Sequence, residues 1–143
     1  MNNRFYKGYV PGKQGKGHEK EPCVAYTKPE NHMTWEQCSI YPNVLGILAD
    51  DVILLDADSE PHSSNLIKII DGEKLGCMVT NREAGRGIHA LLLNDTIKTG
   101  GNGLMLACGV VVDIKLGCKN GLECAKFRGV ERISIHNEQP YQI

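Results

Sequence analysis

Apolar residues in this sequence gather in short runs of four to six residues, rich in valine, isoleucine and leucine. Runs of this length predict β-strands, because amphipathic helices need about ten residues and a membrane span needs about 18. A chain of 143 residues is the size of one ordinary domain. We therefore expect one sheet-containing domain over residues 1–143 and no membrane partner. The predicted strands are Val44–Ala49, Val52–Leu55, Cys77–Thr80, Ile88–Leu93, Leu104–Ala107, Val110–Lys115 and Val130–Ile135.

Two helices are expected among these strands. Thr34 is followed three residues later by Gln37, which is the pattern of a capping box and predicts a short helix over Trp35–Ser39. The Ser-Glu-Pro sequence at 59–61 is a helix-start signal, and apolar residues then recur at spacings of three and four until Gly72. This second pattern predicts an amphipathic helix that packs on a sheet.

Adjacent strands in the sequence are expected to pair antiparallel. The first two runs are separated only by Asp50 and Asp51, and such a two-residue polar break suggests a hairpin. Glycine-rich breaks follow at 85–87 and 100–103. The predicted fold class is therefore α+β, with mostly antiparallel sheets and a few packed helices.

The first 33 residues are rich in glycine, lysine, glutamate and proline and predict an irregular, basic surface segment over 1–33. No apolar stretch follows Arg4 and Lys7, so secretion is not indicated, and we expect a cytoplasmic protein. The six cysteines are then expected to be free thiols, with Cys77 and Cys108 in the core, because their spacing fits no common zinc framework. Because the formal net charge is −1, the surface as a whole does not attract polyanions, and any polyanion partner would have to bind a local basic patch.

The sharpest chemical feature is the apolar run at 52–55, which leads directly into Asp56-Ala57-Asp58. Side chains alternate along a strand, so Asp56 and Asp58 project on one face and can offer oxygen ligands to one hard divalent cation, Mg²⁺ or Mn²⁺. The alternative is that acidic residues simply end the strand and that Asp58 caps the following helix.

A second candidate group is the glycine-flanked basic loop that leads into the strand at 88–93. Arg86 can bind phosphate oxygens bidentately, and the glycines on either side allow the backbone to approach phosphate closely. His89 interrupts an apolar strand and needs a hydrogen-bonding partner or a ligand. The competing interpretation of His89 is a satisfied core histidine.

A third candidate group is Asp113, which interrupts the strand at 110–115 and shares a face with Lys115. A buried carboxylate is costly without a partner, so Asp113 is either one half of an ion pair or a third metal ligand. Two divalent ions held by three carboxylates would suit phosphoryl transfer, with Arg86, His89 and Lys115 binding a triphosphate.

Taken in order, the segments 55–58 (Leu-Asp-Ala-Asp), 87–89 (Gly-Ile-His) and 112–113 (Val-Asp) resemble the three signature motifs of the archaeo-eukaryotic primase superfamily. Those motifs are hydrophobic-D-x-D, small-x-H and hydrophobic-D. The chain is similar to the primase-polymerase domains of phage and plasmid replication proteins, which also carry a basic Gly-Lys segment, a tryptophan-containing helix and a Pro-Asn-hydrophobic-Gly strand. The likeness extends to the loop before His89 and spans about residues 4–135. The corresponding features here are Gly12-Lys13, Trp35, Pro42–Gly46 and Thr80–His89.

The resemblance implies an RRM-like catalytic core and template-directed nucleotidyl transfer to a 3′-hydroxyl, that is, DNA primase and DNA polymerase activity. By position, Asp56, Asp58 and Asp113 would bind the metal ions, and His89 would bind the phosphates of the incoming nucleotide. The implied partners are a single-stranded DNA template, dNTP or NTP, and a helicase domain or protein. The chain would then be the N-terminal part of a longer replication protein. It departs from the family after Asp113, where relatives commonly carry a proline-rich segment and this sequence is rich in cysteine, lysine and glycine.

Other functions fit parts of the pattern. A D-x-D after an apolar strand also serves metal-dependent glycosyltransferases, although their nucleotide-sugar and acceptor sites normally need a longer chain. A metal-dependent nuclease would use the same acids, but the basic glycine loop suits a triphosphate better. An RRM-like nucleic-acid-binding module without catalysis is the alternative outside enzymes, and the missing pair of stacking aromatics on a strand counts against it.

Overall fold

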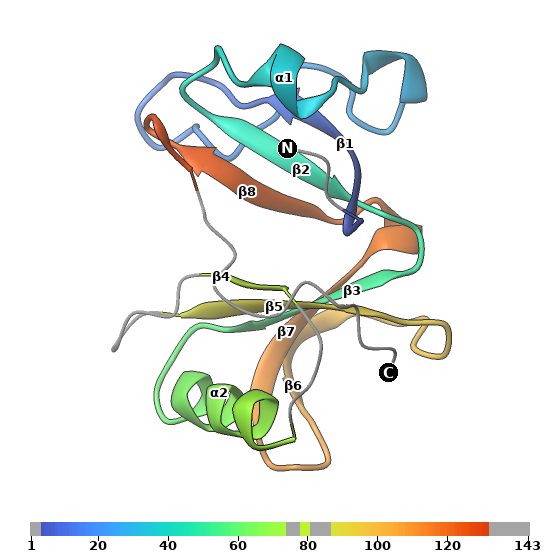
Figure 1. Ribbon diagram of the computed structural model, residues 1–143, viewed down its shortest axis with the longest axis vertical. Helices are drawn as coiled ribbons and strands as arrows, with labels where there is room; N and C mark the ends of the chain where they lie inside the picture. The colour runs from blue at the N-terminus through green and yellow to red at the C-terminus, as the bar shows by residue number, and fades with distance from the viewer. Residues whose placement is uncertain (1–3, 74–77, 81–86, 132–143) are drawn as a thin grey trace. The chain divides into compact units, whose positions relative to one another are not determined.

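The computed structural model describes residues 4–73, 78–80 and 87–131 (Figure 1). These residues divide into two compact units, one formed by 4–50 and 117–131 and the other by 51–73, 78–80 and 87–116. Each unit is built on its own antiparallel sheet with little helix, so the α+β class is confirmed. A single catalytic domain over residues 1–143 stays a prediction. None of the described helices has the length and apolar character needed to cross a membrane.

The first unit contains a four-stranded antiparallel sheet in the order β1-β2-β8-β9. All five residues of the central strand β2 are buried, and the two faces of the sheet pack into separate small cores. Helix α1 covers one face, where Trp35 and Cys38 pack against Tyr9 and Val44. The bounds are β1 Tyr6–Pro11, α1 Trp35–Cys38, β2 Val44–Leu48, β8 Leu122–Phe127 and β9 Val130–Glu131, with 3-10 turns at Pro29–Asn31 and Gly117–Lys119.

The capping box that predicts α1 is present. The Gln37 backbone N–H donates to Thr34 Oγ1 at 3.2 Å, and the Thr34 N–H donates to Gln37 Oε1 at 2.9 Å. Two backbone donors at the helix start are thereby satisfied, which explains how a helix of four residues persists.

The expectation of an irregular segment over 1–33 is wrong for β1. Its sequence mixes lysine, glycine and proline with apolar residues and therefore lacks a clear strand period. The loop that follows is also anchored to the sheet, because the buried Glu19 carboxylate accepts hydrogen bonds from the Gly17 N–H at 2.7 Å and from Arg128 Nε at 2.6 Å. A Cβ atom at Gly12 would lie 2.3 Å from the Glu19 carbonyl oxygen, so this close approach requires glycine.

The second unit contains a five-stranded antiparallel sheet in the order β4-β5-β3-β7-β6. Helix α2 covers one face, as Figure 1 shows, and buries Leu66 and Ile70 against it. Residues 53, 55 and 57 of β3 point into this core, so residues 52, 54 and 56 lie on the opposite face. The bounds are β3 Val52–Ala57, α2 His62–Gly72, β4 Met78–Thr80, β5 Ile88–Leu93, β6 Gly101–Met105 and β7 Val111–Leu116.

The predicted hairpin between β2 and β3 is wrong. The two strands belong to different sheets, β2 pairing with β1 and β8, and β3 pairing with β5 and β7. Two-residue hairpin turns need positive φ angles, which glycine and asparagine supply, and neither Asp50 nor Asp51 is among the positive-φ residues described. The Asp-Asp break therefore links two central strands.

The other strand predictions hold in part. Strand β5 has the predicted bounds, and β4 and β7 agree within one residue among the described positions. The strand expected over Leu104–Ala107 begins earlier, at Gly101, and ends at Met105, because a bulge accommodates the glycines of the expected break. Strand β8 was not predicted. Of the strand expected at Val130–Ile135, Val130–Glu131 is present and the remainder lies outside the described residues.

Candidate active site

Three of the sequence-predicted residues are direct neighbours across three strands. Asp56, on the central strand β3, is the register partner of His89 on β5 and of Asp113 on β7. Side chains that face each other in this way on an antiparallel sheet have Cβ atoms about 5 Å apart. The backbone thus gathers one histidine and two carboxylates into a single row, on the face opposite α2.

Within this row, the Asp56 carboxylate and the His89 imidazole are in direct contact. Asp56 Oδ2 lies 3.4 Å from His89 Nε2, and the two side chains are only 19% and 18% exposed. Partial burial strengthens such a contact relative to a solvent-exposed pair. His89 is therefore not packed as an apolar core residue would be, although a purely structural pair would have the same geometry.

Asp58 follows the end of β3 and is exposed, on the same face as Asp56 by strand parity. Gly87 lies against it, since a Cβ atom at Gly87 would be 2.8 Å from Asp58 Cα and 3.2 Å from the Ala57 carbonyl oxygen. A larger residue at 87 would push the start of β5 away from the end of β3. The small residue of the Gly-Ile-His motif thus allows this close approach. Arg86 lies outside the described residues.

Asp113 has a second contact in the structure. Its Oδ1 atom accepts a hydrogen bond of 2.8 Å from the Gly103 N–H in the bulged part of β6. Lys115 is exposed, on the same face as Asp113 by strand parity and opposite Leu54 in the register. The Gly103 contact gives Asp113 a structural role that any test of catalysis has to separate from metal binding.

The donor set fits a hard divalent cation. Carboxylate oxygens are the ligands that Mg²⁺ and Mn²⁺ prefer, and a carboxylate that accepts one hydrogen bond keeps further lone pairs for a metal. As placed, the described side chains contain no group of three acidic, histidine or cysteine residues close enough to hold an ion. The strand register brings the backbones of these residues close together. To bind an ion jointly with Asp56, the side chains of Asp58 and Asp113 would have to turn toward it.

A second polar cluster lies in the four-stranded unit and was not predicted from the sequence. Tyr6 and Tyr9 are three residues apart, which on a regular strand would put them on opposite faces. A bulge at Lys7 shifts the register, so both tyrosines lie on one face with ring centroids 5.5 Å apart. Trp35 approaches Tyr9 edge-on at 5.3 Å.

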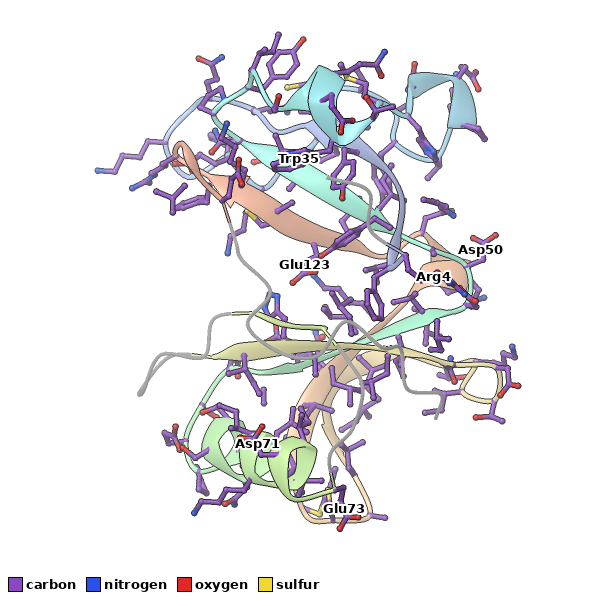
Figure 2. The ribbon with its side chains drawn as sticks, in the orientation of Figure 1. Arg4, Trp35, Asp50, Asp71, Glu73 and Glu123 are labelled. Carbon is purple, nitrogen blue, oxygen red and sulfur yellow. The ribbon has the colours of Figure 1, made fainter. Side chains whose placement is uncertain are left out.

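Glycine on β2 makes room for this cluster. Gly46 is the register partner of Tyr9 on β1 and of Glu123 on β8, and a Cβ atom there would meet the Tyr6 ring at 2.7 Å. The Tyr6 ring therefore crosses β2 above Gly46, and its hydroxyl donates to the buried Glu123 carboxylate. Figure 2 labels Glu123 on β8 and Trp35 on α1.

Burial raises the pKa of the Tyr9 hydroxyl to about 12, with smaller contributions from the nearby Glu36 and Glu123 carboxylates. Because the pKa of Tyr9 is higher in the folded than in the unfolded protein, ionisation of this hydroxyl favours the unfolded state. The unfolding free energy is therefore unaffected below about pH 10 and falls as the pH rises toward 12. Over this range we expect the unfolding free energy of the wild type to fall by up to about 3 kcal/mol relative to Tyr9→Phe. Urea denaturation of both proteins at several alkaline pH values measures the difference. If the difference in unfolding free energy between the wild type and Tyr9→Phe stays constant with pH, the raised pKa of Tyr9 is contradicted.

The five cysteines in the described part of the chain are free thiols. Cys38 and Cys124 are buried, and burial raises the pKa of the Cys38 thiol to about 11. Cys108 is exposed, which corrects its predicted place in the core: it lies in the turn between β6 and β7 rather than on a strand. Cys77 lies outside the described residues.

The primase likeness rests on the motifs themselves, because the chain matches no protein-family model and no curated protein sequence. The chemistry of the site is consequently argued from Asp56, His89 and Asp113 and from the strands that position them.

Proposed function

We propose that the five-stranded unit carries a nucleotidyl-transfer site of the primase-polymerase kind, which extends a 3′-hydroxyl on a single-stranded DNA template with dNTP or NTP. The observation that carries this proposal is the register of β3, β5 and β7, which makes Asp56 the cross-strand neighbour of both His89 and Asp113. Three residues from separate parts of the sequence meet at one point of one sheet face.

Each residue would have a distinct task. Asp56, Asp58 and Asp113 would hold two Mg²⁺ or Mn²⁺ ions, which when bound stabilise the charge that develops on the attacking and leaving oxygens. His89 and the cations Arg86 and Lys115 would bind the triphosphate. The contact with Asp56 would orient the His89 ring, so the imidazole would already be positioned beside the carboxylates that hold the metal ions.

The strand order supports an RRM-like core for this unit. Reading β3-α2-β4-β5 and then β7 along the chain gives the sheet order β4-β5-β3-β7, with the first and third strands at the centre, as in a split β-α-β-β-α-β sheet. Strand β6 takes the place in the chain where such a fold has its second helix. RRM modules that only bind nucleic acid stack bases on aromatics of the two central strands, and neither β3 nor β5 contains a phenylalanine, tyrosine or tryptophan, His89 being the one ring that this face offers on these two strands. Catalysis is therefore the better use of this face.

Extension of a labelled primer tests the proposal. The full chain is incubated with a primed single-stranded template and dNTPs or NTPs, with Mg²⁺, with Mn²⁺ and with EDTA. We expect metal-dependent incorporation directed by the template. No incorporation under any of these conditions would refute the proposal, and metal-dependent degradation of the template would identify the nuclease alternative.

We expect His89→Ala to weaken nucleotide binding by about 1 to 3 kcal/mol, because it removes a hydrogen bond to charged phosphate. Affinity for single-stranded DNA should stay nearly unchanged, since backbone contacts of the template would come from lysines elsewhere. Isothermal titration with a non-hydrolysable dNTP and with an oligonucleotide measures both affinities. His18→Ala is the matched control, because His18 is an exposed histidine of the other unit. Loss of DNA affinity alone would assign His89 to the template.

A further inference from the structure

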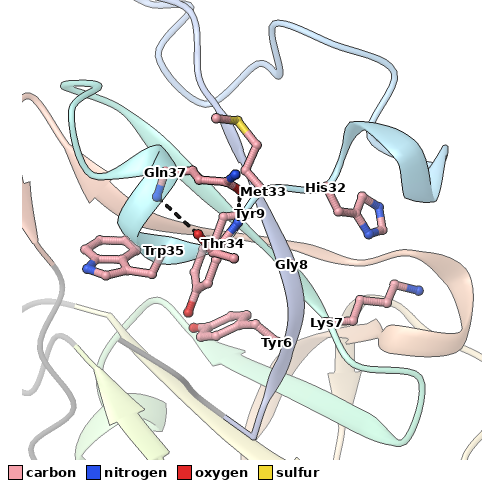
Figure 3. Close-up of a pocket in the computed structure, with 9 residues that line it drawn as sticks. All are labelled: Tyr6, Lys7, Gly8, Tyr9, His32, Met33, Thr34, Trp35 and Gln37. Carbon is pink, nitrogen blue, oxygen red and sulfur yellow. Dashed lines mark hydrogen bonds between the residues drawn. The ribbon is translucent and has the colours of Figure 1, made fainter.

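The four-stranded unit contains a pocket that the proposed nucleotidyl transfer does not use. It encloses about 240 Å³ beside β1 and the start of α1, and Figure 3 shows the residues around it. This volume is below the roughly 300 Å³ at which pockets for drug-sized molecules begin, so it suits a single ring system. The lining residues are Tyr6, Lys7, Gly8, Tyr9, His32, Met33, Thr34, Trp35 and Gln37.

One polar atom in this pocket points to a ligand. The Tyr9 hydroxyl is buried, in a residue only 5% exposed, and it has no hydrogen-bond partner among the described residues. A buried hydroxyl without a partner destabilises the fold, and proteins rarely leave one without a reason. In Figure 3 this hydroxyl lies beside the ring of Trp35 and the hydroxyl end of Tyr6. A ligand in the pocket could satisfy it.

The rim of the pocket offers one further hydrogen-bond donor. The Thr34 hydroxyl is already engaged, since it accepts from the Gln37 N–H and donates to the Glu36 carboxylate, whereas Gln37 Oε1 accepts from the Thr34 N–H and leaves the Gln37 side-chain amide as a donor. The ligand should therefore be flat, to lie among three aromatic rings, and should carry acceptor atoms on its edge. Ring carbonyls and ring nitrogens of a nucleobase have this character.

The pocket has charges of both signs around it. The Glu36 and Glu123 carboxylates lie near the Tyr9 hydroxyl, and Lys7 lines the pocket, so a ligand would place a neutral ring among the aromatic side chains and any anionic group at Lys7. The Lys7 ammonium contacts Asp50 at 2.7 Å and donates to Asn120 Oδ1 at 3.0 Å. Because the Asp50 side chain is 79% exposed, its ion pair with Lys7 is weak, and a phosphate could replace Asp50. Aromatic rings beside a lysine are the combination with which proteins bind unpaired bases of an anionic strand.

We propose that this pocket binds an unpaired nucleobase whose phosphate lies near Lys7. The base would pack against Tyr6 and Trp35 and accept a hydrogen bond from the Tyr9 hydroxyl. The Glu123 carboxylate would act as a positioning group, since it fixes the Tyr6 ring through the Tyr6 hydroxyl. This site goes beyond the proposed catalysis, because base binding here would hold for a non-catalytic chain as well.

Fluorescence of Trp35, the single tryptophan of the chain, tests this proposal. The full chain is titrated with a single-stranded oligonucleotide, with an abasic oligonucleotide of equal length and with a nucleoside monophosphate. We expect quenching of Trp35 by ligands that carry a base. If the oligonucleotide binds much more tightly than the monophosphate, the pocket binds a base that belongs to a nucleic-acid strand. Equal affinities would show that its ligand is a free nucleotide. Equal binding of the abasic strand, or no quenching by any ligand, would overturn the proposal.

Two variants test the contacts to the base. Tyr6→Leu also removes the hydroxyl that donates to the buried Glu123 carboxylate, so Tyr9→Phe is the variant that separates binding from folding. Tyr6→Leu should weaken base binding by about fivefold or more through lost stacking, and Tyr9→Phe by about threefold to tenfold through one lost hydrogen bond. Tyr9→Phe removes a hydroxyl without a protein partner among the described residues, so its melting temperature should not fall. Tyr26→Phe is the control, since Tyr26 packs in the other core of this unit and should bind as the wild type does. Unchanged affinity in Tyr9→Phe would refute the assigned role of its hydroxyl.

The proposal for the pocket and the proposal for the catalytic site can be refuted independently of each other. Asp113→Asn should retain full quenching of Trp35, because Asp113 belongs to the other unit. Quenching that depends on a base, in a wild type that incorporates no nucleotide, would refute the catalytic proposal alone. Incorporation without any quenching would refute the pocket alone.

Discussion

Replacing Asp113 with asparagine is expected to reduce nucleotide incorporation by about 10³-fold or more while leaving the five-stranded sheet folded. A metal-binding carboxylate contributes several kcal/mol to the stabilisation of charge in the transition state, and an amide does not replace it. The amide does keep an Oδ1 acceptor for the Gly103 N–H, which donates to Asp113 at 2.8 Å. The substitution therefore removes the charge and retains the structural hydrogen bond.

Two further variants make this result specific. Asp113→Ala removes both the charge and the acceptor for Gly103, so any additional fall in melting temperature measures the structural role. Asp95→Asn removes an exposed carboxylate of the same unit, outside the row of Asp56, His89 and Asp113, and should retain wild-type activity. Primer extension and thermal melting are measured for all three proteins. An active Asp113→Asn, combined with an unstable Asp113→Ala, would show that Asp113 only anchors β6.

The candidate site was predictable from the sequence because strand parity is a local property. The period of two along β3 places Asp56 and Asp58 on one face, and the same rule places Lys115 with Asp113. That Asp56 faces both His89 and Asp113 could not be derived from parity, since it depends on which strands pair and in which register. The expectation that these residues form one cluster rested on strand-face parity together with the resemblance to the primase motifs, and the register is compatible with it.

The capping box and the period of α2 predicted both helices for a related reason, as each signal lies within a few residues of the helix it describes. The pairing of β2 and β3 failed because it was inferred from closeness in sequence. Both strands are apolar enough to be central strands, and each pairs with strands far away in the sequence. Strand β2, for example, pairs with β8. Long-range pairing of this kind has no local signal.

The Tyr6, Tyr9 and Trp35 pocket was missed because it depends on an irregularity. Only the bulge at Lys7 brings Tyr6 and Tyr9 to one face, and only the absence of a side chain at Gly46 lets the Tyr6 ring cross β2. The available signal was a glycine inside an otherwise apolar strand, which often marks the close approach of another group.

A methyl group at Gly87 is expected to disrupt the site more than the fold. In Gly87→Ala the new Cβ atom would lie 2.8 Å from Asp58 Cα and 3.2 Å from the Ala57 carbonyl oxygen, and both are backbone atoms that cannot rotate away. The start of β5 must then move from the end of β3, and His89 moves with it relative to Asp56. Overpacking of this kind costs about 1 to 3 kcal/mol of stability, and a displacement of about 1 Å in a catalytic site can cost 10²-fold in rate.

Gly72→Ala provides the matched control for this substitution. Gly72 ends α2, a Cβ atom there would meet no atom of the described residues within 4 Å, and its φ is not positive, so alanine should stabilise the unit by about 0.5 to 1 kcal/mol. Thermal melting and primer extension are measured for both variants. We expect both the melting temperature and the extension rate to fall in Gly87→Ala, whereas Gly72→Ala should melt slightly higher and extend primers at the wild-type rate. If Gly87→Ala melts and extends primers as the wild type does, the close approach of β5 to Asp58 is not needed, and the small residue of the motif has no geometric role in this chain.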